Sequence, residues 1–341
     1  MMKQINDVLA WSLLKQELLY TDKKNKLFCV DSLNNDAPEK YNLDYPPSFF
    51  YRIPDNGFVI VDNLNHPSSI YSGNKLLPFD RRDIGDIRIG EQDPRYLVLY
   101  KGETEDRKYI VFDWVESKVK VESEWPFTIV KDKALTIVDG VLKCYTLNGE
   151  LLWQYKREAT YPLLDFEEPA KIIGIYKNEL WIKVNDNSFI VLDAGTGKPI
   201  LANFNLSDEL GVSLSIGDVD LDEQGSRLRI LAYLYYIEID LVTHIATIKK
   251  TYDDNWSIGV GRFYDGDVRV YFTGNNSSSR KNIGKKVAGI FNTNTLEIEW
   301  HYLLPGDDRF HFFADLPQAN DKYFGVKDSN DVLYLFERDV H

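Results

Sequence analysis

Two groups of acidic and histidine side chains have the types and the spacing that could hold a metal ion or move a proton. The stretch GDVDLDEQGSR places Asp218, Asp220 and Asp222 at alternate positions, as at the start of an oxygen-rich calcium loop. The carboxylate that closes such a loop is missing, because residues 226–228 carry no acidic side chain. We therefore expect a solvated hairpin turn here rather than a metal site.

The second group lies in EWHYLLPGDDRFHFF, which brings together five possible ligands or proton carriers: Glu299, His301, Asp307, Asp308 and His311. The two histidines stand on either side of a Pro-Gly turn, at a spacing that matches no common metal motif. The sequence also has no glycine-rich phosphate loop and no Gly-x-Ser-x-Gly elbow. We expect an ordinary loop, no cofactor and no catalytic residue.

Charge and composition narrow the class of partner. The 341 residues include 53 acidic and 40 basic side chains, for a formal net charge of -13, which opposes nucleic acid and anionic lipid alike. The N-terminal stretch lacks the form of a secretory signal, and no apolar run has the length of a spanning helix. Cys29 and Cys144 both lie in apolar runs and are expected to be buried free thiols. We expect a cytoplasmic protein that binds neither nucleic acid nor membranes.

A repeated strand pattern indicates which elements position these side chains. Similar apolar strands end at Asp31, Asp62, Asp113, Thr146, Asp193, Asp240, Asn292 and Glu337. Most of the intervals are close to the length of one four-stranded propeller blade. Each strong strand has a further strand before it and a turn and a strand after it, as in NELWIKVNDNSFIVLDAGTGKPI. No helix of any length is expected between them, which indicates antiparallel meanders.

Two of these stretches resemble known propeller repeats. NELWIKVNDNSFIVLDAGTGKPI and GVLKCYTLNGELLWQY look like the pyrroloquinoline-quinone-type repeat of quinoprotein-like β-propellers. DLDEQGSRLRILAYLYYIEIDLVT is similar to a WD-type blade without its His and Trp signatures. The resemblance implies an all-β propeller fold. It implies no activity, and no functional residue is carried over from either family.

The predicted fold is a single closed β-propeller spanning residues 1–341. We expect seven four-stranded blades, with eight and then six as the alternatives. The last predicted strand ends near the C-terminus with no room for a fourth strand, so an N-terminal strand should complete the last blade. Closure would remove exposed sheet edges.

Acidic links between predicted blades supply the candidate binding surface. They contain carboxylates and aromatic rings, of which the candidate contact residues are Trp125, Tyr161, Asp253, Asp254, Trp256, Asp307, Asp308 and Phe310. Aromatic side chains anchor protein contacts, and carboxylates speed encounter with a basic protein. Trp125 and Trp256 could instead pack between blades. In contrast, residues 273–286 concentrate Arg280, Lys281, Lys285 and Lys286 and are expected to form a mobile hairpin tip.

These observations favour a protein-binding propeller without catalysis. One specific form is a bacterial immunity protein that neutralises a basic toxin domain through its acidic face. The alternatives are a carbohydrate-active enzyme that uses the central channel and a scaffold subunit of a larger complex.

Overall fold

The computed structural model of the chain describes residues 2–338 except for short internal segments. Those segments are residues 15–16, 31–38, 44–48, 54–57, 64–65, 73–74, 80–85, 88–94, 102–106, 114–115, 117, 139, 157–170, 185–186, 253–255, 265–267, 280–283 and 307. For the strands between residues 39 and 87 and for residue 101, the structure describes the backbone alone.

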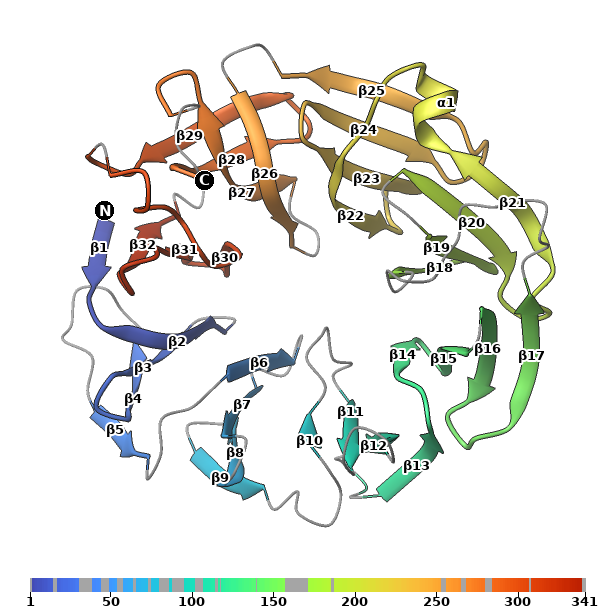
Figure 1. The fold of residues 1–341 in the computed structure, drawn as a ribbon, viewed down its shortest axis with the longest axis horizontal. Helices are drawn as coiled ribbons and strands as arrows, with labels where there is room; N and C mark the ends of the chain where they lie inside the picture. Colours follow the sequence, from blue (N-terminus) through green and yellow to red (C-terminus); the bar gives the residue numbers. More distant parts are fainter. Residues whose placement is uncertain are drawn as a thin grey trace. The chain divides into compact units, whose positions relative to one another are not determined.

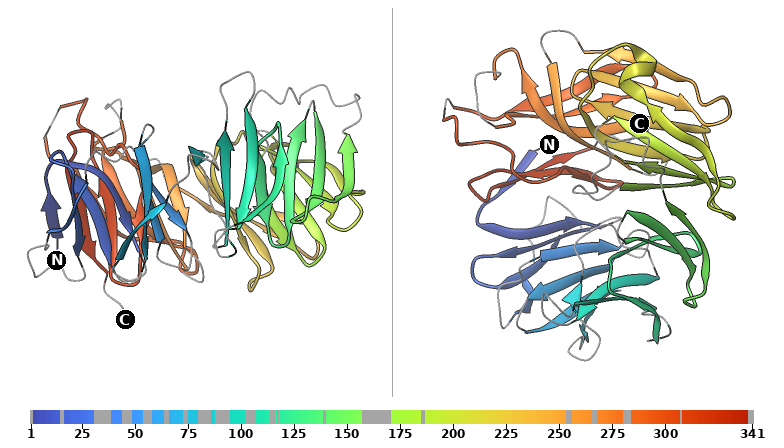
Figure 2. Two further views of the ribbon diagram at one scale, coloured as in Figure 1. Left: turned by 90° about the horizontal axis from the view of Figure 1, so that it is seen from below. Right: turned by 45° about the vertical axis from the view of Figure 1, so that its right-hand side comes forward.

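The described strands form eight four-stranded sheets (Figures 1 and 2), and every pair with a described register is antiparallel. One sheet contains β2 (Val8–Leu13), β3 (Leu18–Asp22), β4 (Lys26–Val30) and β5 (Glu39–Asn42). The next contains β6 (Phe49–Ile53), β7 (Phe58–Asn63), β8 (His66–Ser72) and β9 (Lys75–Phe79). A third contains β10 (Asp86–Ile87), β11 (Tyr96–Lys101), β12 (Lys108–Asp113) and β13 (Lys118–Ser123).

The following sheets repeat the same four-strand order. They contain β14 (Phe127–Val130), β15 (Lys133–Val138), β16 (Val141–Thr146) and β17 (Leu151–Lys156), and then β18 (Lys171–Tyr176), β19 (Glu179–Lys183), β20 (Ser188–Asp193) and β21 (Pro199–Asn205). After them come β22 (Ile216–Asp222), β23 (Arg227–Ala232), β24 (Tyr235–Asp240) and β25 (Ala246–Thr251). The next sheet contains β26 (Trp256–Phe263), β27 (Arg269–Asn276), β28 (Val287–Asn292) and β29 (Glu297–Leu303).

The last sheet joins the two ends of the chain. It contains β30 (Gln318–Ala319), β31 (Tyr323–Lys327), β32 (Leu333–Glu337) and the N-terminal strand β1 (Met2–Ile5). Met2 lies opposite Phe336 and Ile5 opposite Leu333 in an antiparallel pair. The prediction that an N-terminal strand completes the last sheet is therefore confirmed.

The number of sheets differs from the favoured number of blades. The sequence favoured seven blades, whereas the described residues form eight sheets, which corresponds to its first alternative. Each of the eight strands recognised in the sequence lies in a different sheet. The repeat pattern therefore identifies one strand of each sheet, and β1 supplies the strand that the last repeat lacked. Closure of the sheets into a ring, as one domain, stays a prediction.

Burial differs between inner and outer strands in a way that follows the sequence. The third strand β20, with sequence SFIVLD, is buried at every position but the last. The outer strand β29, EIEWHYL, alternates between exposed and half-buried positions. A strand covered on both faces requires a continuous apolar run, whereas a strand with one solvated face shows period-two alternation.

Side-chain caps fix the turns that follow the third strands. The capping residues are Asp113, Asp193, Asp240 and Asn292, whose Oδ1 atoms accept hydrogen bonds from backbone N–H groups two or three residues later. Asp and Asn favour such turns because their short side chains mimic a backbone acceptor. Hydrogen bonds from the Thr243 and Val242 N–H groups lower the pKa of Asp240 below its usual value. This repeated cap explains why so many of the predicted strands end in Asp or Asn.

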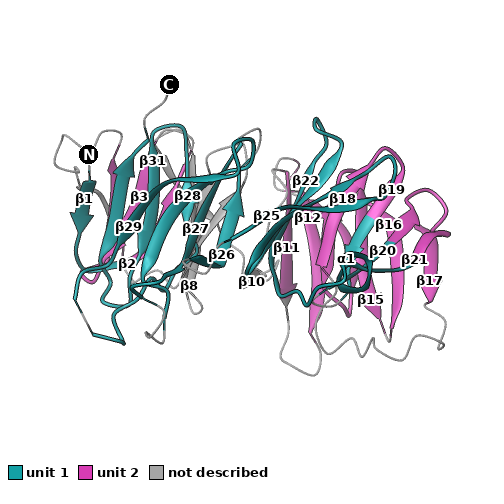
Figure 3. Ribbon diagram, turned by 90° about the horizontal axis from the view of Figure 1, so that it is seen from above, with its two compact units in different colours: residues 1–8, 181–190, 203–341 teal, residues 9–180, 191–202 magenta. Residues whose placement is uncertain are grey.

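The residues group into two compact units, coloured separately in Figure 3. Unit 1 contains residues 1–8, 181–190 and 203–341, and unit 2 contains residues 9–180 and 191–202. In unit 2, Trp153 of β17 is 7% exposed, and its Nε1 donates to the carbonyl oxygen of Ala194 at 3.0 Å. Its ring also covers Gly197, where an added Cβ would lie 2.5 Å from Trp153 Cε3. Trp153 therefore fastens β17 to the turn between β20 and β21.

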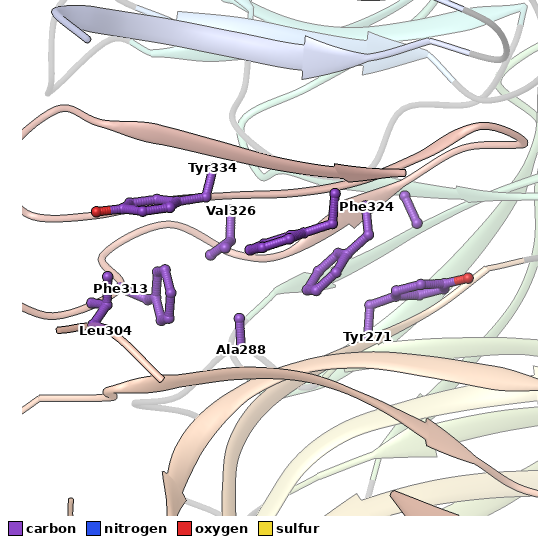
Figure 4. Packing of buried hydrophobic residues seen from close by; sticks show 9 residues of the cluster. Tyr271, Ala288, Leu304, Phe313, Phe324, Val326 and Tyr334 are labelled. Atoms are coloured by element: carbon purple, nitrogen blue, oxygen red, sulfur yellow. The ribbon is translucent and has the colours of Figure 1, made fainter. Parts of the chain in front are cut away.

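Unit 1 has a core rich in aromatic rings, part of which is shown in Figure 4. Tyr271 and Ala288 of the sheet β26–β29 pack with Phe324 and Tyr334 of the last sheet. The ring centroids of Tyr271 and Phe324 are 5.2 Å apart. Aromatic rings bury a large area each and stabilise the contact between neighbouring sheets.

The one helix among the described residues is α1 (Leu206–Leu210), in the link between β21 and β22. Asn205 caps it by accepting hydrogen bonds from the N–H groups of Ser207 and Asp208. The sequence predicted no helix of any length, and the structure differs from that prediction by the short helix α1. Across all the residues that the structure describes, no helix is long and apolar enough to cross a membrane.

Candidate interaction surface

The aspartates of GDVDLD lie on a strand rather than in a turn. Asp218, Asp220 and Asp222 all belong to β22, and only Asp222 borders the hairpin turn. Asp220 Oδ2 accepts hydrogen bonds from Nε and Nη2 of Arg229 at 2.9 and 2.6 Å. Asp222 Oδ2 accepts from Nε of Arg227 at 2.9 Å. The expectation of a hairpin turn is corrected: the strand pairing of β22 with β23 sets arginines against these carboxylates.

The second group of possible ligands is dispersed. Glu299 pairs with Arg269 at 2.8 Å, and the ring of His301 contacts the ring of Trp256 at 5.0 Å between centroids. His311 Nε2 lies 2.7 Å from Oδ2 of Asp328, in a different turn. Within the part of the chain that the structure describes, no three His, Cys, Asp or Glu side chains gather in a way that could hold a metal ion.

Asp328 is a buried carboxylate with a structural role. Its Oδ1 accepts from the N–H groups of Asn330 and Val332, and its Oδ2 accepts from the hydroxyl of Tyr334 at 3.1 Å. Burial and the charge of Asp328 together raise the pKa of Tyr334. This network ties the turn between β31 and β32 to His311 in the link before β30. It anchors that link to the last sheet.

The basic stretch does not form a wholly exposed hairpin tip. Lys286 is 1% exposed, and its Nζ donates to the carbonyl oxygen of Asp308 at 2.6 Å. Lys285 is half-buried, which lowers the pKa of its ammonium. Thr273 is buried within β27. The prediction is therefore wrong for these positions, because the stretch packs against the link between β29 and β30. Arg280 and Lys281 lie outside the described residues.

Half of the predicted contact residues can be placed. Those outside the described residues are Tyr161, Asp253, Asp254 and Asp307. Trp125, in the link between β13 and β14 of unit 2, is 40% exposed. Trp256 is half-buried, and its ring makes an edge contact with Phe272 at 6.4 Å between centroids. Trp256 thus contributes to the core of unit 1, the alternative that the sequence left open.

Phe310 and Asp308 share an exposed loop whose backbone is held in place. Phe310 is 60% exposed, and the guanidinium of Arg309 lies 4.9 Å from its ring centroid. The Phe310 N–H donates to Asp308 Oδ1 at 2.9 Å, and the Phe310 carbonyl accepts from Ser329 Oγ at 2.8 Å. Together with the Lys286 contact, these bonds fix the loop that presents an aromatic ring to solvent.

A further exposed segment, consisting of two apolar residues, was not predicted from the sequence. Tyr233 and Leu234 form the tip of the hairpin between β23 and β24 and are 50% and 38% exposed. The predicted contact residues all lie in the links predicted between repeats, and none lies in a turn within a repeat. The signal was present in RILAYLYYIEID: an apolar run too long for one strand must contain a turn, and the residues at that turn must face solvent.

Both exposed segments lie at the same end of their sheets in unit 1. Tyr233 accepts a hydrogen bond from the Ile258 N–H near the start of β26, and Trp256 at that start pairs with Asn276 at the end of β27. The link that follows β29 leaves from the same end. From the exposed residues at this end we select six and call them the link face: Asp208, Glu209, Tyr233, Leu234, Asp308 and Phe310.

Comparison with known proteins gives the fold. The C-terminal WD40 domain of Sif2 matches with a TM-score of 0.64 at 11% identity, over 99% of this chain and 98% of that one. Sqt1 from Saccharomyces cerevisiae matches with 0.61 at 12% identity, over 99% and 97%. A computationally designed protein, Ika8, matches with 0.60 at 10% identity, over 98% and 96%. The expected resemblance to WD40-like β-propellers is confirmed at the level of the fold, and the resemblance to quinoprotein-like repeats stays a prediction.

A scan against protein-family models finds no match, and a search of curated proteins finds none either. The likenesses to solved structures have identities of 10 to 12% and therefore concern the fold and not the activity.

Proposed function

We propose that this chain is a protein-interaction scaffold without catalysis, and that it binds its partner through the link face. The observation that carries the proposal is the exposed ring of Phe310 on a loop that is fixed by Lys286, Ser329 and Asp308. An exposed aromatic ring on an ordered backbone loses little entropy when a partner covers it. Aromatic anchors of this kind dominate the energy of protein interfaces.

The charge of the link face favours a basic partner. Asp208, Glu209 and Asp308 are exposed, and none of their carboxylates forms an ion pair with another described residue. Two opposing charges lie in the same loop region, Arg309 beside Phe310 and the Lys286 ammonium at the Asp308 carbonyl oxygen. Unpaired carboxylates attract a basic protein during diffusion and raise the association rate. The net charge of -13 acts in the same direction.

A bacterial immunity protein that neutralises a basic toxin domain is the most specific form of this proposal. Its support is the acidic charge of the chain, and a cytoplasmic location belongs to the same hypothesis. A subunit that holds a larger complex together would use the same surface. The two forms differ in whether the partner is inactivated when it binds.

The test is to purify the tagged chain from its source cells, identify a co-purifying protein, and rebuild the complex from separately expressed proteins. We expect a stoichiometric complex that dissociates more readily as salt rises, because charges are screened over about 8 Å at physiological ionic strength. Phe310→Ala should weaken it at least about tenfold. A rebuilt complex that is indifferent to salt and to Phe310→Ala would contradict the proposed surface. The absence of any stoichiometric partner would contradict the scaffold itself.

A further inference from the structure

The hairpin tip at Tyr233 and Leu234 has an unusual composition. Tight hairpin turns usually use Gly, Asn or Asp, because these residues adopt turn geometry at low cost and are compatible with water. Here a tyrosine and a leucine occupy the tip and are 50% and 38% exposed. A single exposed apolar side chain is ordinary. Two in succession at a turn, at the same end of unit 1 as Phe310, form an exposed apolar site.

The backbone of this tip is held by the links on both sides of it. The Tyr233 N–H donates to the carbonyl oxygen of Ser215 at 3.0 Å. The carbonyl oxygens of Tyr233 and Leu234 accept from the N–H groups of Ile258 at 3.2 Å and Tyr252 at 2.9 Å. The tip is therefore ordered before any partner arrives, which reduces the entropy lost on binding.

The charge of the link face indicates what kind of partner segment would bind at the tip. Ser215, which accepts from Tyr233, lies in the same link as α1, and α1 exposes Asp208 and Glu209. The helix α1 contacts β25, and Tyr252, which follows β25, donates to the Leu234 carbonyl oxygen. A face that carries both carboxylates and an apolar tip is complementary to a segment that carries both basic and apolar side chains. Purely apolar segments gain nothing from the carboxylates, and acidic segments are repelled by them.

We propose that Tyr233 and Leu234 are a second anchor of the link face, in addition to Phe310, and that they bind a basic, apolar-containing segment of a partner protein. This inference rests on the proposed function and names its contact site and the chemistry of its partner. Tyr233 is the principal contact, because a tyrosine supplies a large area and a hydroxyl at low entropic cost. The carboxylates of α1 raise the association rate, and the apolar tip lowers the dissociation rate.

The chain contains a matched control for this site. Val242 and Ile245 are 64% and 58% exposed in the turn between β24 and β25. Because β24 has the tip at its beginning and this turn at its end, the two pairs lie at opposite ends of one strand. Both pairs are exposed and apolar, and both have an ordered backbone. In the control turn, the Ile245 carbonyl oxygen accepts from the Asp240 N–H, and the Val242 N–H donates to Oδ1 of Asp240.

The probe is a short fluorescein-labelled peptide in which lysine alternates with leucine, measured by fluorescence anisotropy against the full chain. Two further peptides replace every lysine by glutamate or every leucine by serine. We expect saturable binding of the lysine–leucine peptide only, weakened about tenfold or more by Tyr233→Ala with Leu234→Ala. Val242→Ala with Ile245→Ala should leave it unchanged. Asp208→Asn with Glu209→Gln should slow association by a few fold and flatten its dependence on salt.

Several results would overturn the inference. They are equal weakening by the control pair, equal binding of the glutamate peptide, and no saturable binding of the lysine–leucine peptide at concentrations up to about 1 mM. Circular dichroism of each variant checks that it remains folded. These failures are distinct from failure of the proposed function, since a stoichiometric complex could still form through Phe310 alone.

Discussion

The contact between Trp153 and Gly197 should make the effects of two substitutions depend on each other. Gly197 has φ +69°, a left-handed conformation, and an added Cβ would meet the Trp153 ring at 2.5 Å. Gly197→Ala should therefore be destabilising for two reasons while the ring is present. When the ring is removed by Trp153→Ala, only the backbone strain remains.

The magnitudes follow from these two effects. A left-handed alanine costs about 1–2 kcal/mol, and overpacking against a buried ring costs about 1–3 kcal/mol. Gly197→Ala should thus cost about 2–5 kcal/mol in the natural chain and about 1–2 kcal/mol beside Trp153→Ala. Trp153→Ala alone should cost about 3–5 kcal/mol, of which the hydrogen bond to Ala194 contributes about 1 kcal/mol. The coupling between the two sites is then about 1–3 kcal/mol.

The assay is urea unfolding of the natural chain, both single variants and the double variant. Far-ultraviolet circular dichroism is the appropriate signal, because tryptophan fluorescence changes with Trp153 itself. Leu152→Ala is the control, since Leu152 is 45% exposed on the same strand and should change the free energy of unfolding by less than about 0.5 kcal/mol. Additive costs, within about 0.5 kcal/mol, would refute the contact.

Three further predictions concern groups that the sequence singled out or that the structure buries. Metal-stripped protein should show no micromolar calcium affinity in calorimetric titration, because Arg229 holds the Asp220 carboxylate; such an affinity, lost in Asp220→Ala, would contradict this. Burial alone would raise the pKa of Asp113, but hydrogen bonds from Arg95 and the Glu116 N–H and the charge of Arg95 lower it overall. Its contribution to stability is therefore present above the unfolded value of about 3.9 and is lost as pH falls through the lower folded value. Melting temperatures should show Asp113→Asn less stable than the natural chain near neutral pH, with the difference shrinking in acid; a constant difference would argue against the pairing. Trp256→Ala should lower the melting temperature without weakening the lysine–leucine peptide, whereas the reverse result would make Trp256 a contact residue.

The sequence predicted the strands well because their signal is local. Asp193 and Asp240 end apolar runs, and each also caps the turn that follows, so one residue marks both a strand end and a turn. The pairing of β1 with β32 was also predictable, since the last repeat was one strand short. The number of sheets was harder to predict. The eight repeated strands favoured eight sheets, whereas the missing fourth strand of the last repeat favoured seven.

Side-chain environment could not be read from the sequence, because it depends on residues distant along the chain. Asp220 was expected to lie in a solvated hairpin turn, but strand pairing places Arg229 opposite it. Lys286 looked like part of an exposed basic tip, but the link after β29 covers it. Trp256 could be an anchor or a core residue, and its packing against Phe272 and the surrounding core distinguishes the two.

The most direct test of the central claim is amide hydrogen exchange of the chain alone and in the complex rebuilt with its partner. If the link face binds the partner, exchange should slow in residues 206–215, 233–234 and 308–313, and residues 241–245 should exchange at the same rate in both states. Slowing confined to residues 241–245, or to other segments away from the link face, would show that the partner binds elsewhere.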